Sequence, residues 1–202
     1  SSELAPHLKA LTDGNPAQAS KNAYVTLIAG MDQRFKYRGF LYNAIIMRKA
    51  LREKGSTADF IAMLGLSDST KEGIESMRTD VDLLKSHGII VYVLPRLIHD
   101  SHPFNFAEMA LLKITPYSFV QYDRVQFYDG DIMPTRNMDC FFALNDNTFT
   151  LGAVSPLNSG WFLALPSTQS FESMRERAVW RLSRDWDKVQ GWGVPMPKGM
   201  TY

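Results

Sequence analysis

The sequence predicts an α/β fold in which a mostly parallel central sheet is flanked by helices. Two observations lead to this prediction. Short, almost continuously apolar runs alternate with segments of helical periodicity, in the order β-α-β-α-β. The runs are apolar on both faces, as in strands that helices cover from both sides, and such strands belong to parallel sheets with helical crossovers.

The first half of the chain contains three predicted strands, with a helix after each of the first two. Glycine or proline closes each apolar run. Ser69 or Thr70 is the predicted cap of the second helix. The expected segments are, in order, a strand at 23–30, a helix at 39–54, a strand at 60–65, a helix at 71–86 and a strand at 89–94. Residues 1–22 are expected to form an N-terminal tail or a short helix that docks late.

The second half begins with a charged and aromatic loop at 95–105, which is long enough to be functional. A strand at 125–128 leads into Asp129-Gly130-Asp131 and cannot continue through Pro134. The other expected segments are a helix at 107–114, strands at 148–154 and 160–165 joined by a loop at 155–159, and a helix at 169–184. Residues 185–202 show no periodicity. Because no linker or repeat is visible, we expect one domain over residues 23–202.

Composition excludes several classes of protein. The 202 residues are 45% hydrophobic and 21% charged, as in an ordinary soluble globular domain. A net charge of +1 disfavours a nucleic-acid or membrane-surface binder. The chain contains no run of about 18 apolar residues, so no membrane span is predicted. Cys140 is the single cysteine, so no internal disulfide forms and a cytoplasmic location is expected. His99 and His102 have the spacing of metal ligands but lack a third partner.

Asp129 and Asp131 form the most informative pattern in the chain. Two nearby carboxylates repel each other unless a cation lies between them, and Mg²⁺ or Mn²⁺ binds carboxylates together with substrate phosphates. The same spacing occurs at Asp80/Asp82 and Asp185/Asp187. The first of these pairs lies in a helical segment, where solvated charges are expected, and the second stays open. Since ligands collect at the carboxyl ends of strands in α/β sheets, 129–131 is the predicted metal and diphosphate site.

Several stretches, by their order and spacing, resemble glycosyltransferase family 8, the group that contains glycogenin and galactinol synthase. The matching residues are 24–27, 39–41, Lys113 within 112–114, 117–122, 127–131, 158–162 and 166–167. The resemblance implies an A-type nucleotide-diphospho-sugar transferase fold and a Mn²⁺-dependent enzyme, with Mg²⁺ as the other candidate. It also implies retaining transfer of glucose or galactose from a UDP-sugar to a carbohydrate, polyol or glycoprotein acceptor, and it suggests a homodimer.

The resemblance also implies a role for individual residues. Asp129 and Asp131 would hold the metal, with Asp129 also touching ribose, and Gly130 would let the backbone approach the ligand. Lys113 and Asn158 complete the expected catalytic set with these two aspartates. Thr26, Leu27, Ala29 and Tyr37 are the expected nucleotide contacts, and Asn158, Ser159 and Gly160 form the expected sugar-binding loop. From the residues alone, Lys113 fits a solvated helix lysine equally well, and 158–160 fits a plain turn equally well. For Thr26, Leu27 and Ala29, the residues alone favour ordinary strand core.

Two departures from the family pattern keep a second function open. Its His-x-x-Gly-x-x-Lys element is absent, because all four histidines precede Asp129, and no Asp-Gln-Gly element follows the last helix. We therefore expect either that the chain lacks C-terminal elements of the family or that its metal site is incomplete. The alternative function is a UDP-sugar-binding scaffold with little or no turnover. A nucleotidyltransferase would need a glycine-rich basic loop after the first strand, where only Gly30 occurs. No nucleophile is evident, which favours attack on the face that the diphosphate leaves, with a diphosphate oxygen accepting the proton.

Overall fold

A computed structural model of the protein describes residues 5–31, 35–67, 70–97, 106–152 and 158–182. Its centre is a six-stranded sheet in the order β3-β2-β1-β4-β6-β5. The first four of these strands run parallel, and β6 is antiparallel to both β4 and β5. The strands are β1 (Asn22–Ala29), β2 (Asp59–Gly65), β3 (Ile90–Leu94), β4 (Arg124–Asp129), β5 (Thr148–Thr150) and β6 (Asn158–Ala164). The predicted fold class, a mostly parallel sheet flanked by helices, is confirmed.

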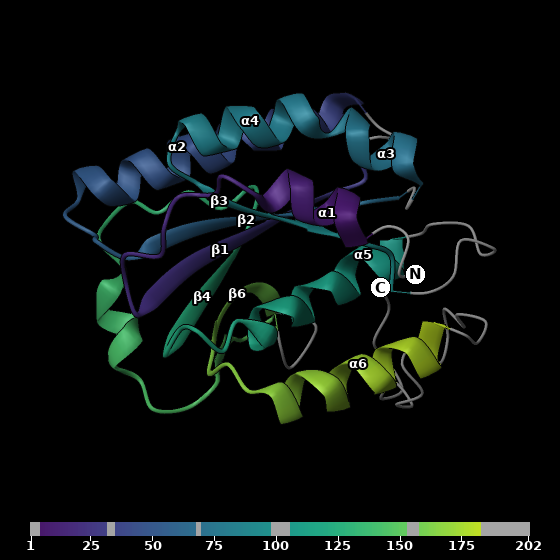
Figure 1. Ribbon diagram of the computed structural model, residues 1–202. Helices are drawn as coiled ribbons and strands as arrows, with labels where there is room; N and C mark the ends of the chain where they lie inside the picture. The colour runs from purple at the N-terminus through teal and green to yellow at the C-terminus, as the bar shows by residue number, and fades with distance from the viewer. Residues whose placement is uncertain (1–4, 32–34, 68–69, 98–105, 153–157, 183–202) are drawn as a thin grey trace.

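Helices cover both faces of this sheet (Figure 1). The α-helices are α1 (Ala5–Thr12), α2 (Gly39–Glu53), α3 (Lys71–Ser76), α4 (Arg78–Ser86), α5 (Phe106–Leu111) and α6 (Thr168–Leu182), and the 3-10 helices are η1 (Phe35–Arg38), η2 (Leu112–Ser118) and η3 (Asp139–Ala143). In Figure 1, α2, α3 and α4 lie on one side of the sheet, and α5 and α6 lie on the other. None of the helices in the described ranges is long and apolar enough to cross a membrane.

Strand alternation divides the core into two layers. On β1, Tyr24 and Ile28 pack into the layer beneath α2 and α4, whereas Ala23 and Val25 pack into the layer beneath η2 and α6. All seven residues of β2 are buried. The near-continuous apolar character of the parallel strands therefore arises from burial on both faces.

The segment predicted as a tail or short helix contains α1, which packs against α3 and β3. Leu11 is 2% exposed and belongs to the first core layer. After the helix, Asn15 bonds the outer edge of β3: its Nδ2 donates to the Val91 carbonyl at 2.8 Å, and the Val91 N–H donates to its Oδ1 at 2.9 Å. This side chain satisfies backbone groups that an edge strand otherwise leaves unpaired.

The predicted helix at 71–86 is two helices, α3 and α4, that meet at Met77. Thr70 is its cap and accepts a hydrogen bond from the Gly73 N–H at 3.1 Å. The prediction that Asp80 is solvated is wrong, because it is only 7% exposed. It lies beside Val81 and one turn after Met77, at the border of the buried stripe. Burial raises the pKa of Asp80, and the charge of Arg38, whose Nε is 3.3 Å away, opposes that rise.

Several predicted boundaries in the second half are shifted. The helix at 107–114 becomes α5 followed by η2, which contains Pro116, a residue without the N–H that an α-helix needs. The strand predicted at 148–154 comprises only Thr148–Thr150, and the 3-10 helix η3 at Asp139–Ala143 was not predicted. Asn158 and Ser159 begin β6 instead of ending a loop. His99, His102, Asp185 and Asp187 lie outside the described residues.

Candidate functional site

The topology places an opening at the carboxyl ends of β1 and β4. From β1 the chain moves outward through β2 to β3 and then returns to form β4 on the other side of β1. At such a switch point the connections leave in opposite directions, so a crevice opens between the two strand ends. Leu27 of β1 lies opposite Asp129 of β4 in the register. The last residues of both strands therefore face the same crevice.

A cavity of about 290 Å³ occupies this crevice. Its walls come from the ends of β1 and β4, the start of α2 and the α5–η2 segment. The lining residues are Leu27, Ile28, Ala29, Tyr37, Phe40, Met109, Ala110, Lys113, Asp129, Gly130 and Asp131. Apolar walls with a few convergent charged groups are typical of small-molecule sites.

The structure brings most of the predicted site residues together. Those that line the cavity are Leu27, Ala29, Tyr37, Lys113, Asp129, Gly130 and Asp131. Thr26, the first predicted nucleotide contact, does not line it. Its side chain is fully buried within the sheet, and its Oγ1 has no hydrogen-bond partner among the described residues. The strand-core interpretation, which the residues alone favoured, describes this position.

The predicted sugar-binding residues lie beside the cavity, at the start of β6. Asn158 accepts a hydrogen bond from the Gly160 N–H at 2.8 Å through its Oδ1, so this amide oxygen orders the strand end itself. A Cβ on Gly160 would lie 3.5 Å from Asp129 Oδ2. The absence of a side chain at 160 therefore leaves space beside this carboxylate.

Lys113 is the charged partner of Asp129. Its Nζ lies 2.6 Å from Asp129 Oδ1, and the two side chains are 20% and 32% exposed. The same ammonium donates to Ser159 Oγ at 3.3 Å and lies 5.5 Å from the centroid of the Phe127 ring. Carboxylate, hydroxyl and ring face are all favourable neighbours of a cation. Lys113 is therefore not the solvated helix lysine that its sequence context also allowed.

The backbone around the two aspartates is held from both sides. The Ile132 N–H donates to the Asp129 carbonyl at 3.0 Å and forms a turn directly after β4. Asn43 of α2 donates through Nδ2 to the Gly130 carbonyl at 3.0 Å. These two bonds fix the turn that presents Asp129 and Asp131 to the cavity.

The donor set at this turn suits a divalent cation that shares its coordination with a ligand. Asp129 is partly exposed and Asp131 is exposed, and both line the cavity. Within the described part of the chain, no three His, Cys, Asp or Glu side chains gather as a closed metal centre would require. Mg²⁺ and Mn²⁺ commonly bind one or two carboxylates and complete their shell with phosphate oxygens and water. Asp129 and Asp131 fit this kind of site.

An aromatic and aliphatic wall, of which only Tyr37 was among the predicted site residues, lines the same cavity as these carboxylates. Phe40 at the start of α2 and Tyr37 of η1 have ring centroids 6.0 Å apart. Met109 and Ala110 precede Lys113 by four and three residues, which is the spacing of one helical face, so this signal was available in the sequence. Phe40 belongs to the matching stretch 39–41, but its place in the wall depends on how α2 packs above β4, which no local pattern gives.

A buried ion pair anchors the segment that carries Met109, Ala110 and Lys113. Glu108 is fully buried, Arg96 is 5% exposed, and Arg96 Nη2 donates to Glu108 Oε2 at 2.8 Å. The Leu97 N–H also donates to Glu108, at 3.1 Å. The start of α5 is therefore tied to the chain that leaves β3, which holds one wall of the cavity in place.

Known proteins provide an independent comparison. No family model matches the chain. It is 28% identical over 165 residues to inositol phosphorylceramide glucuronosyltransferase 1 of Arabidopsis thaliana, an alignment that covers 80% of this chain and 27% of the relative. It is 22% identical over 166 residues to UDP-glucuronate:xylan alpha-glucuronosyltransferase 1 of the same plant, covering 81% of this chain and 22% of the relative. The chain thus spans about a quarter of the length of these relatives.

Two solved structures superpose on the chain. The glycosyltransferase GlyE of Streptococcus pneumoniae TIGR4 superposes with a TM-score of 0.47 at 17% identity, covering 79% of this chain and 38% of that chain. An active-site mutant of LgtC superposes with a TM-score of 0.48 at 12% identity, covering 87% of this chain and 66% of that chain.

Proposed function

We propose that this chain is the donor-binding part of a glycosyltransferase that uses a UDP-sugar together with Mn²⁺ or Mg²⁺. One observation carries the proposal: Asp129 and Asp131 end β4 at the switch point of the sheet, beside a cavity with Lys113 on one wall and aromatic rings on another. The names of the relatives, which are glucuronosyltransferases, support it.

Each wall of the cavity matches one part of such a donor. The rings of Tyr37 and Phe40 offer an apolar surface for the base, next to the carboxyl end of β1. Asp129 and Asp131 would hold the metal ion, which, when bound, stabilises the negative charge of the departing diphosphate. Lys113 adds an ammonium at the same place. The sugar would lie toward Ser159 and Gly160, beyond the aspartates.

The sugar itself is proposed from the relatives. A UDP-glucuronate donor, as one relative's name states, is favoured over the UDP-glucose or UDP-galactose expected from the sequence. Among the described residues, the cavity carries no carboxylate other than Asp129 and Asp131. Both would be engaged with the metal ion, so we propose retention by same-face attack, in which a diphosphate oxygen accepts the proton of an acceptor hydroxyl.

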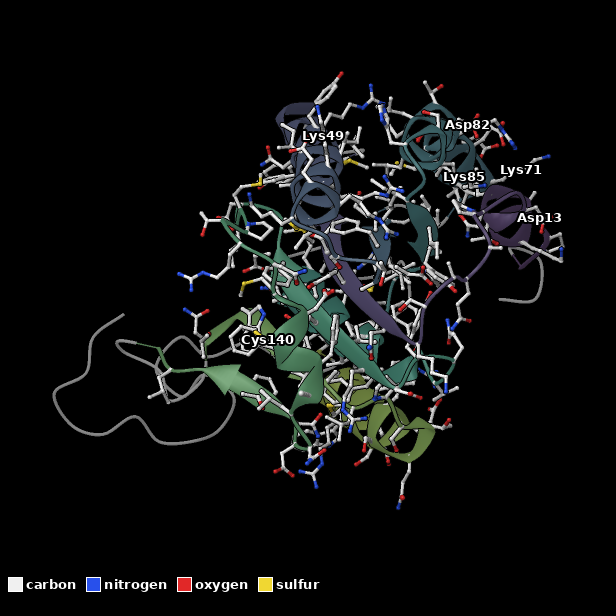
Figure 2. All side chains as sticks on the ribbon, turned by 90° about the vertical axis from the view of Figure 1, so that its left-hand side faces the viewer. Asp13, Lys49, Lys71, Asp82, Lys85 and Cys140 are labelled. Carbon is white, nitrogen blue, oxygen red and sulfur yellow. The ribbon has the colours of Figure 1, made fainter. Side chains whose placement is uncertain are left out.

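The test measures release of UDP from UDP-glucuronate, UDP-glucose and UDP-galactose in Mn²⁺, with the wild-type protein and Asp131→Asn. We expect Asp131→Asn to lower the rate at least about 100-fold, because the metal site loses a charged ligand. Asp82→Asn is the matched control, since Asp82 is an exposed aspartate of the same spacing pattern, located on α4 (Figure 2). Equal rates for wild type and Asp131→Asn would refute the role of Asp131.

The scaffold function remains the second candidate, because the described residues bring only two carboxylates to the cavity. Calorimetric binding of UDP-sugar to this chain without release of UDP would support the scaffold instead of the enzyme. The expected cytoplasmic location and homodimer stay predictions.

A further inference from the structure

The ammonium of Lys113 is the cation that neutralises Asp129 in this structure. It lies 2.6 Å from Asp129 Oδ1, which is the distance of a short charge-assisted hydrogen bond. Ser159 Oγ accepts a second bond from it at 3.3 Å, and the Phe127 ring lies beneath it at 5.5 Å. These three neighbours belong to β4 and β6, whereas Lys113 belongs to η2. The ammonium thus bridges two walls of the cavity.

This arrangement competes with a metal ion for the same carboxylate. A divalent cation on Asp129 would stand within a few ångströms of the ammonium, and like charges at this distance repel strongly in a partly buried site. Metal binding at Asp129 therefore requires Lys113 to move away from Oδ1. Its long unbranched stem permits such a movement, and its side chain is 20% exposed at the cavity wall.

A nucleotide diphosphate would supply the displaced ammonium with a new partner. Lys113, Asp129 and Asp131 line one cavity, so phosphate oxygens held near the two aspartates would lie within reach of the lysine. If a metal ion bound Asp129 without a nucleotide, the displaced ammonium would lose its carboxylate partner and gain only water. With a nucleotide, it would exchange one anion for another.

We propose that Lys113 is the internal counter-ion of Asp129 when neither metal nor nucleotide is bound, and that its displacement from Asp129 makes metal binding depend on nucleotide. The inference rests on the proposed function, because it assumes a metal ion and a diphosphate at this cavity. It assigns Lys113 a role before any chemistry occurs: the lysine keeps Asp129 neutralised until metal and donor arrive together. Binding of the two is then positively cooperative.

The experiment titrates Mn²⁺ into the protein, with and without UDP, and follows free Mn²⁺ by electron paramagnetic resonance. The variants are Lys113→Gln, which removes the charge, and Lys113→Arg, which keeps it. Lys49→Gln is the matched control for net charge, because Lys49 is 74% exposed on α2 and its nearest acidic partner is Glu53 at 3.8 Å (Figure 2). Circular dichroism verifies that each variant is folded.

Without UDP, we expect Lys113→Gln to bind Mn²⁺ about tenfold more tightly than wild type, whereas Lys113→Arg and Lys49→Gln bind as wild type does. UDP should strengthen Mn²⁺ binding more in wild type than in Lys113→Gln, by the same factor of about ten, because only wild type gains from relocating the ammonium.

Two results overturn the inference in distinguishable ways. If wild type binds Mn²⁺ in the presence of UDP, but Lys113→Gln without UDP binds Mn²⁺ no more tightly than wild type does, then the ammonium does not compete and the proposed function stands alone. If no variant binds Mn²⁺ even with UDP, then the metal-dependent donor site fails as well.

Discussion

At the scale of the residue, Gly130 shows why the position between the two aspartates is small. Its backbone does not have a positive φ, so conformation does not demand glycine there. A Cβ on Gly130 would instead lie 3.1 Å from Phe40 Cδ1, which is tighter than nine in ten real Cβ contacts. The expected reason was close approach of the backbone to a ligand. The structure adds the packing of an aromatic ring against the turn.

Gly130→Ala is therefore predicted to act on the cavity more than on stability. The ring of Phe40 must shift by a few tenths of an ångström. Because Phe40 lines the cavity together with the two aspartates, this shift changes the shape of the cavity. We expect affinity for UDP in Mn²⁺, measured by calorimetry, to fall about tenfold, with the free energy of unfolding lowered by less than about 1 kcal/mol. A variant that binds UDP as tightly as wild type would show that Phe40 yields without changing the site.

At the scale of the element, Gly65 marks where β2, β1 and η2 come together. A Cβ there would lie 2.6 Å from Leu112 Cδ1 of η2 and 2.9 Å from the Ala29 Cβ of β1. Ala29 lines the cavity, and Lys113 follows Leu112 in the chain. The close approach of these three elements thus brings the end of β1 next to the segment that carries the lysine.

Gly65→Ala is predicted to lower the free energy of unfolding by about 2–3 kcal/mol, because no space exists for the methyl group between β1 and η2. Gly39→Ala is the matched control. Gly39 begins α2, its Cβ would meet nothing within 4 Å, and alanine favours a helix. Urea denaturation of both variants measures the difference. If Gly65→Ala were as stable as Gly39→Ala, the proposed close packing of β1, β2 and η2 would be wrong.

At the scale of the whole molecule, four buried tyrosines in the two core layers make the free energy of unfolding depend on pH in the alkaline range. Burial is the largest cause of a raised pKa in each of them: Tyr24, Tyr117, Tyr122 and Tyr128. Two of the four also donate to carboxylates, Tyr24 to Asp139 at 2.5 Å and Tyr122 to Asp59 at 3.1 Å. Ionised forms of these phenols would be unpaired charges in the core, so the native state keeps them protonated.

For Tyr117, the direction in which pH changes the free energy of unfolding can be worked out. In the unfolded chain its phenol ionises near pH 10.0, and burial raises the pKa of Tyr117 to about 12 in the native state. Between these values the native state binds the extra proton, so the free energy of unfolding falls as pH rises, and below pH 10 the contribution is fully present. We expect Tyr117→Phe to recover on the order of 2 kcal/mol of this loss by pH 11.5.

Urea denaturation between pH 8 and pH 11.5 checks this prediction. Phe at 117 keeps the stacked contact with Phe162, whose ring centroid lies 6.2 Å away. Tyr42→Phe is the control, because Tyr42 is 61% exposed on α2. Identical pH profiles for Tyr117→Phe and wild type would contradict a buried, protonated Tyr117.

The parallel part of the sheet and the location of the aspartate pair were predicted because both depend on local patterns. Apolar runs of strand length mark β1 to β4, and Asp129 follows the last of them, at the edge where the carboxyl ends of parallel strands meet. The short β5 and the earlier start of β6 were missed. β6 pairs with β4 on one side and with β5 on the other, and these pairings, which no local pattern encodes, decide where the two strands begin and end.

By itself, the sequence determined the fold class, the order of the parallel strands along the chain and the two carboxylates at the end of β4, because hydrophobic periodicity and turn residues act over short distances. Only the tertiary structure decided that Lys113 neutralises Asp129, that Phe40 covers Gly130 and that Asp80 is buried. Each of these features depends on side chains that come from different helices and strands. Their geometry depends on how whole helices pack on the sheet, and no local pattern encodes that packing.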